Sequence, residues 1–155
     1  MVAIIDYGEM AIAFILAMVL FATSTSKPIF TVALFVIGVL VLTVSEYTVH
    51  RFFLHNLTPI RHRLHHASPD EAVLTVFWQI WACFALVYLI AGGAVLAGVL
   101  VAYTWYLFVH HCAHHNHDYL PVGLLQHHQA HHRFAKRNYG VSTTLWDHVF
   151  RTMLR

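Results

Sequence analysis

The sequence predicts an all-α integral membrane protein with four transmembrane helices and a histidine-rich helical cap on the cytosolic side. Three observations lead to this prediction. The chain is 59% hydrophobic and only 10% charged, whereas charged residues make up about a quarter of an average soluble protein. Four apolar runs approach the ~20 residues that a helix needs to cross a bilayer. The fifteen histidines gather after the second run and from the end of the fourth run onward.

We place the four membrane helices at roughly 10–25, 29–46, 72–91 and 94–111. The first has only Asp6 and Glu9 before it and no Lys or Arg, which favours a retained membrane helix over a cleaved signal peptide.

The breaks between the runs carry helix-start and turn signals. Pro28 ends the polar segment TSTSKP and is suited to begin the second helix. The segment Ser68-Pro69-Asp70-Glu71 resembles a helix start with a capping serine and an acidic first turn. Gly92-Gly93 predicts a tight hairpin between the third and fourth helices. We expect a single domain over 1–155, with the cap formed by 47–71 and 112–155.

The connections place all the histidine segments on one side of the membrane. The second and third helices are joined through the first histidine segments, and the third and fourth by only the Gly-Gly turn. The fourth helix therefore returns the chain to the side where the second helix left it. Of nine Lys and Arg residues only Lys27 falls on the other side. The positive-inside rule then places the histidines and both termini in the cytoplasm, and this charge placement explains the small net positive charge without a nucleic-acid partner.

The spacing of the histidines predicts a dinuclear metal centre. Residues three and four apart share a helix face, so the repeated motif His-x2-His-His, at 62–66 and 128–132, can direct three imidazoles into one small volume. His50 and His55 are five apart, about 140° around an ideal helix, which predicts a bend or partial unwinding between them. About ten converging nitrogens are too many for one ion and suit two. Iron, copper and zinc all accept such ligands, so ligand type alone does not choose the metal.

Other polar residues have weaker claims. Glu46 either holds the tautomer of a metal-binding imidazole through a hydrogen bond or lies at a solvated helix end. Asp118 and Asp147 are similar candidates. We expect His148 at the surface. We leave open whether further histidines substitute as ligands: His111, His115, His117 and His127. The two cysteines, Cys83 and Cys112, are expected to be buried free thiols.

The order and spacing of these motifs resemble the fatty acid hydroxylase and sterol desaturase superfamily. The matching segments are His50-Arg-Phe-Phe-Leu-His55, His62-Arg-Leu-His65-His66, His110-x3-His114-His115 and His128-Gln-Ala-His131-His132. The resemblance covers roughly 46–152. It implies a membrane-bound non-haem di-iron oxygenase that uses O2, with zinc possible in purified protein. It also implies ten metal ligands: His50, His55, His62, His65, His66, His110, His114, His128, His131 and His132.

The resemblance also predicts a reaction. It implies hydroxylation of an unactivated C–H bond of a membrane lipid, with electrons from an external b-type cytochrome or a ferredoxin with its reductase. The tail NYGVSTTLWD, 138–147, is similar to the closing segment of fatty acid 2-hydroxylases and favours a fatty acyl substrate. The short step from His55 to His62 is nearer the sterol and carotenoid branches, so a sterol or carotenoid hydroxylase or desaturase is the alternative.

Two other classes of protein remain open from the residues alone. One is a non-catalytic metal-binding or transport protein, although transport calls for polar or ionisable residues within the span, and the four runs have almost none. The other is a haem electron carrier with two histidine ligands, which needs histidine pairs facing each other across the membrane.

Overall fold

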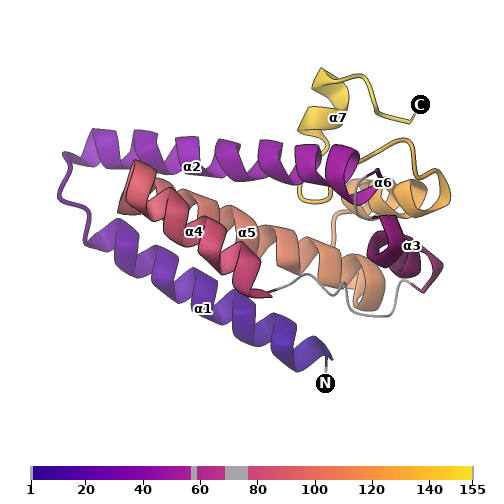
Figure 1. Cartoon of the computed structure of the whole chain (residues 1–155), viewed down its shortest axis with the longest axis horizontal. Helices are drawn as coiled ribbons and strands as arrows, with labels where there is room; N and C mark the ends of the chain where they lie inside the picture. Colours follow the sequence, from indigo (N-terminus) through magenta and orange to yellow (C-terminus); the bar gives the residue numbers. More distant parts are fainter. Residues whose placement is uncertain (1, 57–58, 69–76, 155) are drawn as a thin grey trace. The chain divides into compact units, whose positions relative to one another are not determined.

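The computed structural model describes residues 2–56, 59–68 and 77–154. Over this part of the chain the structure is helical and contains no strand (Figure 1), which confirms the all-α prediction there. The elements are α1 (Val2–Ala22), α2 (Pro28–Thr48), the π-helix η1 (Val49–Leu54), α3 (Pro59–Ala67), α4 (Phe77–Ala91), α5 (Gly93–His115), the 3-10 helix η2 (His117–Tyr119), α6 (Val122–Arg133) and α7 (Leu145–Val149).

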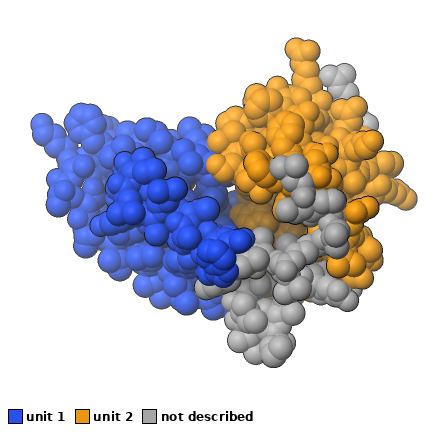
Figure 2. All heavy atoms as spheres, viewed as in Figure 1, with its two compact units in different colours: residues 1, 3–42, 74–105 blue, residues 2, 43–73, 106–155 orange. Residues whose placement is uncertain are grey.

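The chain falls into two compact units, coloured separately in Figure 2. The first unit comprises Ala3–Leu42 and Leu74–Trp105, and the second comprises Thr43–Val73 and Tyr106–Arg155. Helices α2 and α5 each begin in the first unit and end in the second. The expectation of a single domain stays a prediction.

Two described helices, rather than the expected four, are long and apolar enough to cross a membrane. They are Pro28–Leu54, with mean hydropathy 2.5, and Gly93–His115, with mean hydropathy 1.6. The other two apolar helices are shorter over the described residues, at Tyr7–Ala22 and Trp78–Ala91. The start of the helix expected at 72–91 and the expected helix start at 69–71 lie outside the described residues. The four crossings and their orientation therefore stay predictions.

Two glycines in the first unit let α2 and α5 pack backbone against backbone. A Cβ atom at Gly38 would overlap the carbonyl oxygen of Val95, and one at Gly98 would overlap the carbonyl oxygen of Phe35. Small residues permit such close approach between apolar helices. Only glycine fits at these two positions of the α2–α5 contact.

A carboxylate links three helices of the first unit. Glu9 lies inside α1, which begins earlier than the expected residue 10. Its Oε1 accepts hydrogen bonds from Tyr103 Oη at 2.7 Å and from Trp81 Nε1 at 3.3 Å, joining α1 to α5 and α4.

Gly92, with φ 82°, makes the predicted tight turn between α4 and α5, because glycine adopts positive φ without strain.

A small hydrophobic core in the second unit fixes the end of α5. The helix runs to His115 instead of ending at 111. Its apolar side chains in this stretch are buried, and the chain on either side of α6 contributes to the same cluster: Val109, Cys112, Ala113, Leu120 and Val141. With these side chains buried in the core, α5 is anchored at the place where it carries His110 and His114.

Candidate metal centre

A π-helical turn brings the first two histidines together. Val49–Leu54 forms η1, in which hydrogen bonds run between residues five apart. The wider turn places His50 and His55 on one face, with their rings stacked at a centroid distance of 5.1 Å. The predicted unwinding between these residues is confirmed, and its form is the π-helix.

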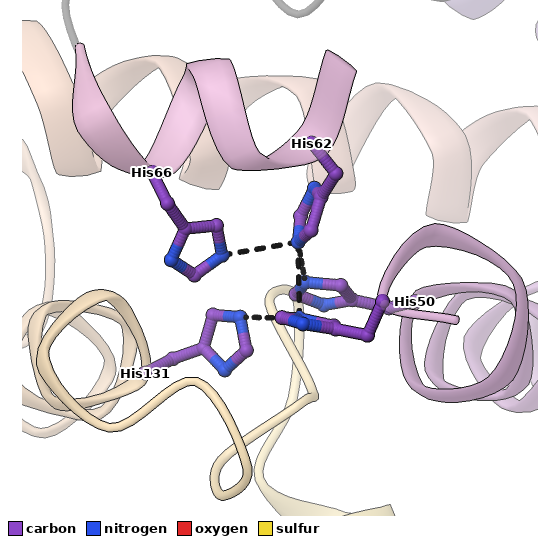
Figure 3. A group of neighbouring side chains, drawn as sticks. His50, His62, His66 and His131 are labelled. Carbon is purple, nitrogen blue, oxygen red and sulfur yellow. Dashed lines mark hydrogen bonds between the residues drawn. The ribbon is translucent and has the colours of Figure 1, made fainter. Parts of the chain in front are cut away.

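Five histidines converge in what we call group 1: His50, His55, His62, His66 and His131. One ring nitrogen from each lies within 4.8 Å of the others. Figure 3 shows His62 and His66 reaching down from α3, with His50 from η1 and His131 from α6 facing them. Residues at distant places in the sequence thus enclose one small volume.

Group 2 consists of His65, His114, His128 and His132, whose ring nitrogens again lie within 4.8 Å of one another. His128 Nε2 is 2.9 Å from His114 Nε2 and 3.1 Å from His132 Nε2. His110 borders this group, because its Nε2 lies 3.1 Å from that of His65. All ten predicted ligands are therefore in or beside the two groups, although their role as ligands stays a prediction.

Each His-x2-His-His motif divides its rings between the two groups. His62 and His66 belong to group 1 while His65 belongs to group 2; in α6 the i+3 residue, His131, is again the one that differs from its i and i+4 partners. On a helix the i+4 residue lies about 40° past residue i and the i+3 residue about 60° before it. The expectation that each motif directs three imidazoles into one volume was therefore wrong.

One nitrogen of group 1 has more close neighbours than hydrogen bonds alone can explain. His62 Nε2 lies 3.0 Å from the Nε2 atoms of His50, His55 and His66. A neutral imidazole nitrogen carries either one hydrogen or one lone pair, so it cannot form three such bonds. A cation at the shared centre would use every lone pair, and histidine nitrogen is a common ligand for iron, copper and zinc. The donor set therefore fits a metal ion.

These imidazoles are neutral and ready to bind metal. Burial, assisted by the charge that neighbouring histidines would carry, lowers the pKa of His62 to about 2 and that of His132 to about 2. Burial likewise lowers the pKa of His55 to about 4 and is the main reason that the pKa of His131 falls to about 3. Only the neutral form of imidazole offers a lone pair to a metal.

Two backbone carbonyls fix ring orientation in group 1. His50 Nδ1 donates to the carbonyl oxygen of Tyr139 at 2.5 Å, and His131 Nδ1 donates to that of Arg137 at 2.7 Å. Because a carbonyl can only accept, each ring carries its proton on Nδ1 and turns the Nε2 lone pair toward the group. Such contacts behind the ligands commonly set the tautomer in metal sites.

Two carboxylates hold the loop that supplies these carbonyls. Asp147 is fully buried and accepts hydrogen bonds from the backbone N–H groups of Tyr139 and Gly140 at 2.9 and 2.7 Å. Burial raises its pKa, but hydrogen bonds from four donors outweigh burial and lower the pKa overall. Glu46 accepts from the backbone N–H groups of Val141 and Ser142 at 2.6 and 3.0 Å.

Neither interpretation offered for Glu46 was right. Its carboxylate accepts hydrogen bonds from the backbone N–H groups of Val141 and Ser142 instead of an imidazole, and it is partly buried instead of solvated. Asp118 is exposed and belongs to neither histidine group.

The histidines left open by the sequence lie outside both groups. His127 is buried and its Nε2 donates to Asp147 Oδ2 at 3.0 Å. His111 lies 3.4 Å from the Asn116 side chain, and His115 and His117 are exposed. His148 is exposed as predicted, and its ring bonds to its own helix. Of the two cysteines, Cys112 is buried as expected but Cys83 is exposed, and both are free.

The sequence model of the fatty acid hydroxylase family matches residues 35–152, most of the chain and every histidine of the two groups. The chain belongs to the fatty acid hydroxylase family. It is 30% identical to fatty acid 2-hydroxylase of Mus musculus, over 79% of this chain and 40% of the relative. It is 33% identical to dihydroceramide fatty acyl 2-hydroxylase of Arabidopsis thaliana, over 75% of this chain and 58% of the relative.

A solved structure of this family supports the fold. The hydroxylase domain of full-length scs7p superposes with a TM-score of 0.72 at 27% identity, covering 99% of this chain and 64% of that chain. The chain thus spans less than two thirds of the length of each of these relatives.

The sequence interpretation missed the carbonyls of Arg137 and Tyr139 and the loop-holding role of Asp147. The one available signal was the tail motif at 138–147, which the resemblance singled out without a structural role. A backbone carbonyl leaves no trace in residue type, so this part of the site depended on the fold.

Proposed function

We propose that this chain is a membrane-bound di-iron hydroxylase that inserts one oxygen atom from O2 into a C–H bond of a fatty acyl chain, at carbon 2. The relatives that it matches are named as fatty acid 2-hydroxylases and as hydroxylases of dihydroceramide or ceramide fatty acyl chains. Their names favour an acyl substrate, free or within a ceramide, over a sterol or a carotenoid.

The convergence of three Nε2 atoms on that of His62 is the observation that carries this proposal. We assign one metal ion to group 1 and a second to group 2, with His110 completing group 2. Helices α3 and α6, which carry the two His-x2-His-His motifs, each contribute rings to both groups. This arrangement supports a close pair of ions. The short chain step from His55 to His62 is compatible with this, since both residues lie in group 1.

When bound, a pair of iron ions supplies O2 activation and the oxidising power to break an unactivated C–H bond. The chain's own residues prepare the site. Neutral imidazoles leave most of the positive charge on the metals, and the carbonyls of Arg137 and Tyr139 hold two rings in place. The ring of Tyr106 stacks on His110 at 5.8 Å, which restrains that ring. Phe52 and Phe53, each 49% exposed beside His50, offer an apolar surface to an acyl chain.

The same proposal includes a location and an electron source. The two long apolar helices support a membrane protein, and we propose four crossings with the histidine groups and both termini on the cytoplasmic side. Eight of nine Lys and Arg residues fall on that side of the sequence. Two electrons per turnover come from an external donor, a b-type cytochrome or a ferredoxin with its reductase.

Lipid analysis of cells that express the chain tests the proposal. We expect 2-hydroxylated acyl chains in cells with the native chain and none above background with His131→Ala. The His148→Ala variant should match the native chain, because His148 is exposed and outside both groups. Hydroxylated sterol or carotenoid in place of acyl product would contradict the substrate, and changed cellular zinc with no oxidised lipid would indicate a metal-handling protein instead.

A further inference from the structure

The two histidine groups differ in how their rings are supported. In group 1, His50 and His131 each donate from Nδ1 to a backbone carbonyl of the loop 137–140. In group 2, the Nδ1 atoms of His128 and His132 are buried and have no hydrogen-bond partner among the described residues. In group 1 the same holds for His62 Nδ1, so the difference lies in the two rings that the loop carbonyls hold. The loop therefore organises group 1 and leaves these two rings of group 2 without the same restraint.

The carboxylate of Asp147 accepts hydrogen bonds from the backbone of this loop. Its Oδ1 accepts from Tyr139 N at 2.9 Å and from Thr152 Oγ1 at 2.6 Å, and its Oδ2 accepts from Gly140 N at 2.7 Å. His127 Nε2 completes the shell at 3.0 Å. The peptide group between Tyr139 and Gly140 thus donates to Asp147 through the Gly140 N–H, while its carbonyl, that of Tyr139, accepts from His50.

Glu46 and Asn138 also hold this part of the chain. The N–H groups of Tyr139 and Gly140, however, donate to Asp147. Asn138 has a positive φ of 55°, and its side chain bonds to the carbonyl of His127 and the N–H of Leu154. A positive φ is unfavourable for a residue other than glycine and needs surrounding contacts to hold it. Replacing Asp147 would leave buried N–H groups of the loop without an acceptor, so the loop would move and carry both carbonyls with it.

We propose that Asp147 is a positioning residue for group 1 alone: through the loop 137–140 it sets the tautomer and direction of His50 and His131, and so makes group 1 the tighter of the two metal sites. This inference rests on the proposed metal pair but not on the hydroxylation. Contacts behind metal ligands typically change affinity about 10–100-fold, so loss of Asp147 should weaken group 1 by at least about tenfold.

The test isolates each group in the purified protein. His128→Ala leaves group 1 as the intact site, and His62→Ala leaves group 2. Zinc affinity of each is measured by competition with a chromophoric chelator, with and without Asp147→Asn. We expect weaker zinc binding by at least about tenfold in the His128→Ala background and no change in the His62→Ala background. We also expect zinc to bind more tightly to the His128→Ala protein than to the His62→Ala protein.

Two further variants separate positioning from general loss of structure. Thr152→Val removes one of the four donors to Asp147 and should weaken group 1 in the same direction by a smaller factor. Asp118→Asn changes an exposed carboxylate in the same unit and should leave both affinities as they are. An equal loss at both groups, or no loss at group 1 with Asp147→Asn and Thr152→Val, would overturn the positioning role. Absence of zinc from both single-group proteins would instead overturn the metal pair itself.

Discussion

His65 and His66 are adjacent in the sequence, yet their rings belong to different groups, with centroids 6.2 Å apart. The same division occurs in α6 between His131 and its neighbours. One short helix therefore contributes to both proposed metal sites, which ties the two sites together structurally.

Single substitutions of these two neighbours should remove different metals. We expect His66→Ala to lower occupancy of group 1 and His65→Ala to lower occupancy of group 2, each leaving about one metal per chain in place of two. Metal-to-protein ratios by elemental analysis check this, together with X-ray absorption of the remaining metal. The matched control is His148→Ala, which should keep both metals. Loss of both metals from either single variant would show that the groups do not act as separate sites.

The metal-free protein should lose stability in mild acid. The folded-state pKa values of His55 and His62 are about 4 and about 2, below the value of about 6.5 for histidine in an unfolded chain. As the pH falls below about 6.5, the unfolded chain takes up protons that the folded protein does not, so the free energy of unfolding falls. We expect the melting temperature in detergent to drop between pH 7 and pH 5.

Replacing a buried histidine gives the control for this pH effect. His62→Gln removes one of the groups that titrate differently in the two states, so the decline with acid should be shallower. Bound metal should raise the melting temperature at neutral pH, because binding to the folded state adds stability. A melting temperature that does not change with pH in the metal-free native chain would contradict the burial of neutral imidazoles.

The close contact of α2 and α5 should not tolerate a methyl group. Gly98→Ala would place a Cβ against the carbonyl oxygen of Phe35, and overpacking of this kind costs about 1–3 kcal/mol. Gly123→Ala in α6 is the matched control, since a Cβ there has nothing within 4 Å; it should be neutral or stabilise by up to about 1 kcal/mol. Denaturation of both variants measures the difference. Equal stability of the two would mean that the helices do not pack at Gly98.

Cysteine labelling tests the proposed orientation in the membrane. In a chain without the exposed Cys83, Ser26→Cys should react with an impermeant reagent only from outside the cell. Lys136→Cys, at an exposed position just after the end of α6, should react only after the membrane is opened. Labelling of both cysteines from the same side would contradict the orientation derived from the positive charges.

The sequence was enough to predict the helical fold and the meeting of distant histidines. The apolar runs predict the helices, and the five-residue spacing of His50 and His55 predicts a departure from the α-helix, which is the π-turn η1. The division of each His-x2-His-His motif was missed, because residues three and four apart share a helix face only roughly and the sequence does not show which rings face them. The carbonyls of Arg137 and Tyr139 were equally hidden, since any residue supplies a carbonyl and only the fold aims it.

The central claim is that paired metals in these two groups insert oxygen into an acyl chain. The most direct measurement supplies 18O2 and a reductant to the iron-loaded chain with ceramide or fatty acid, followed by mass spectrometry of the extracted lipids. The account predicts one 18O atom per product, as a hydroxyl at carbon 2, and no product with His131→Ala. An iron-loaded chain that is reduced by the donor and still leaves every acyl chain unlabelled would contradict it.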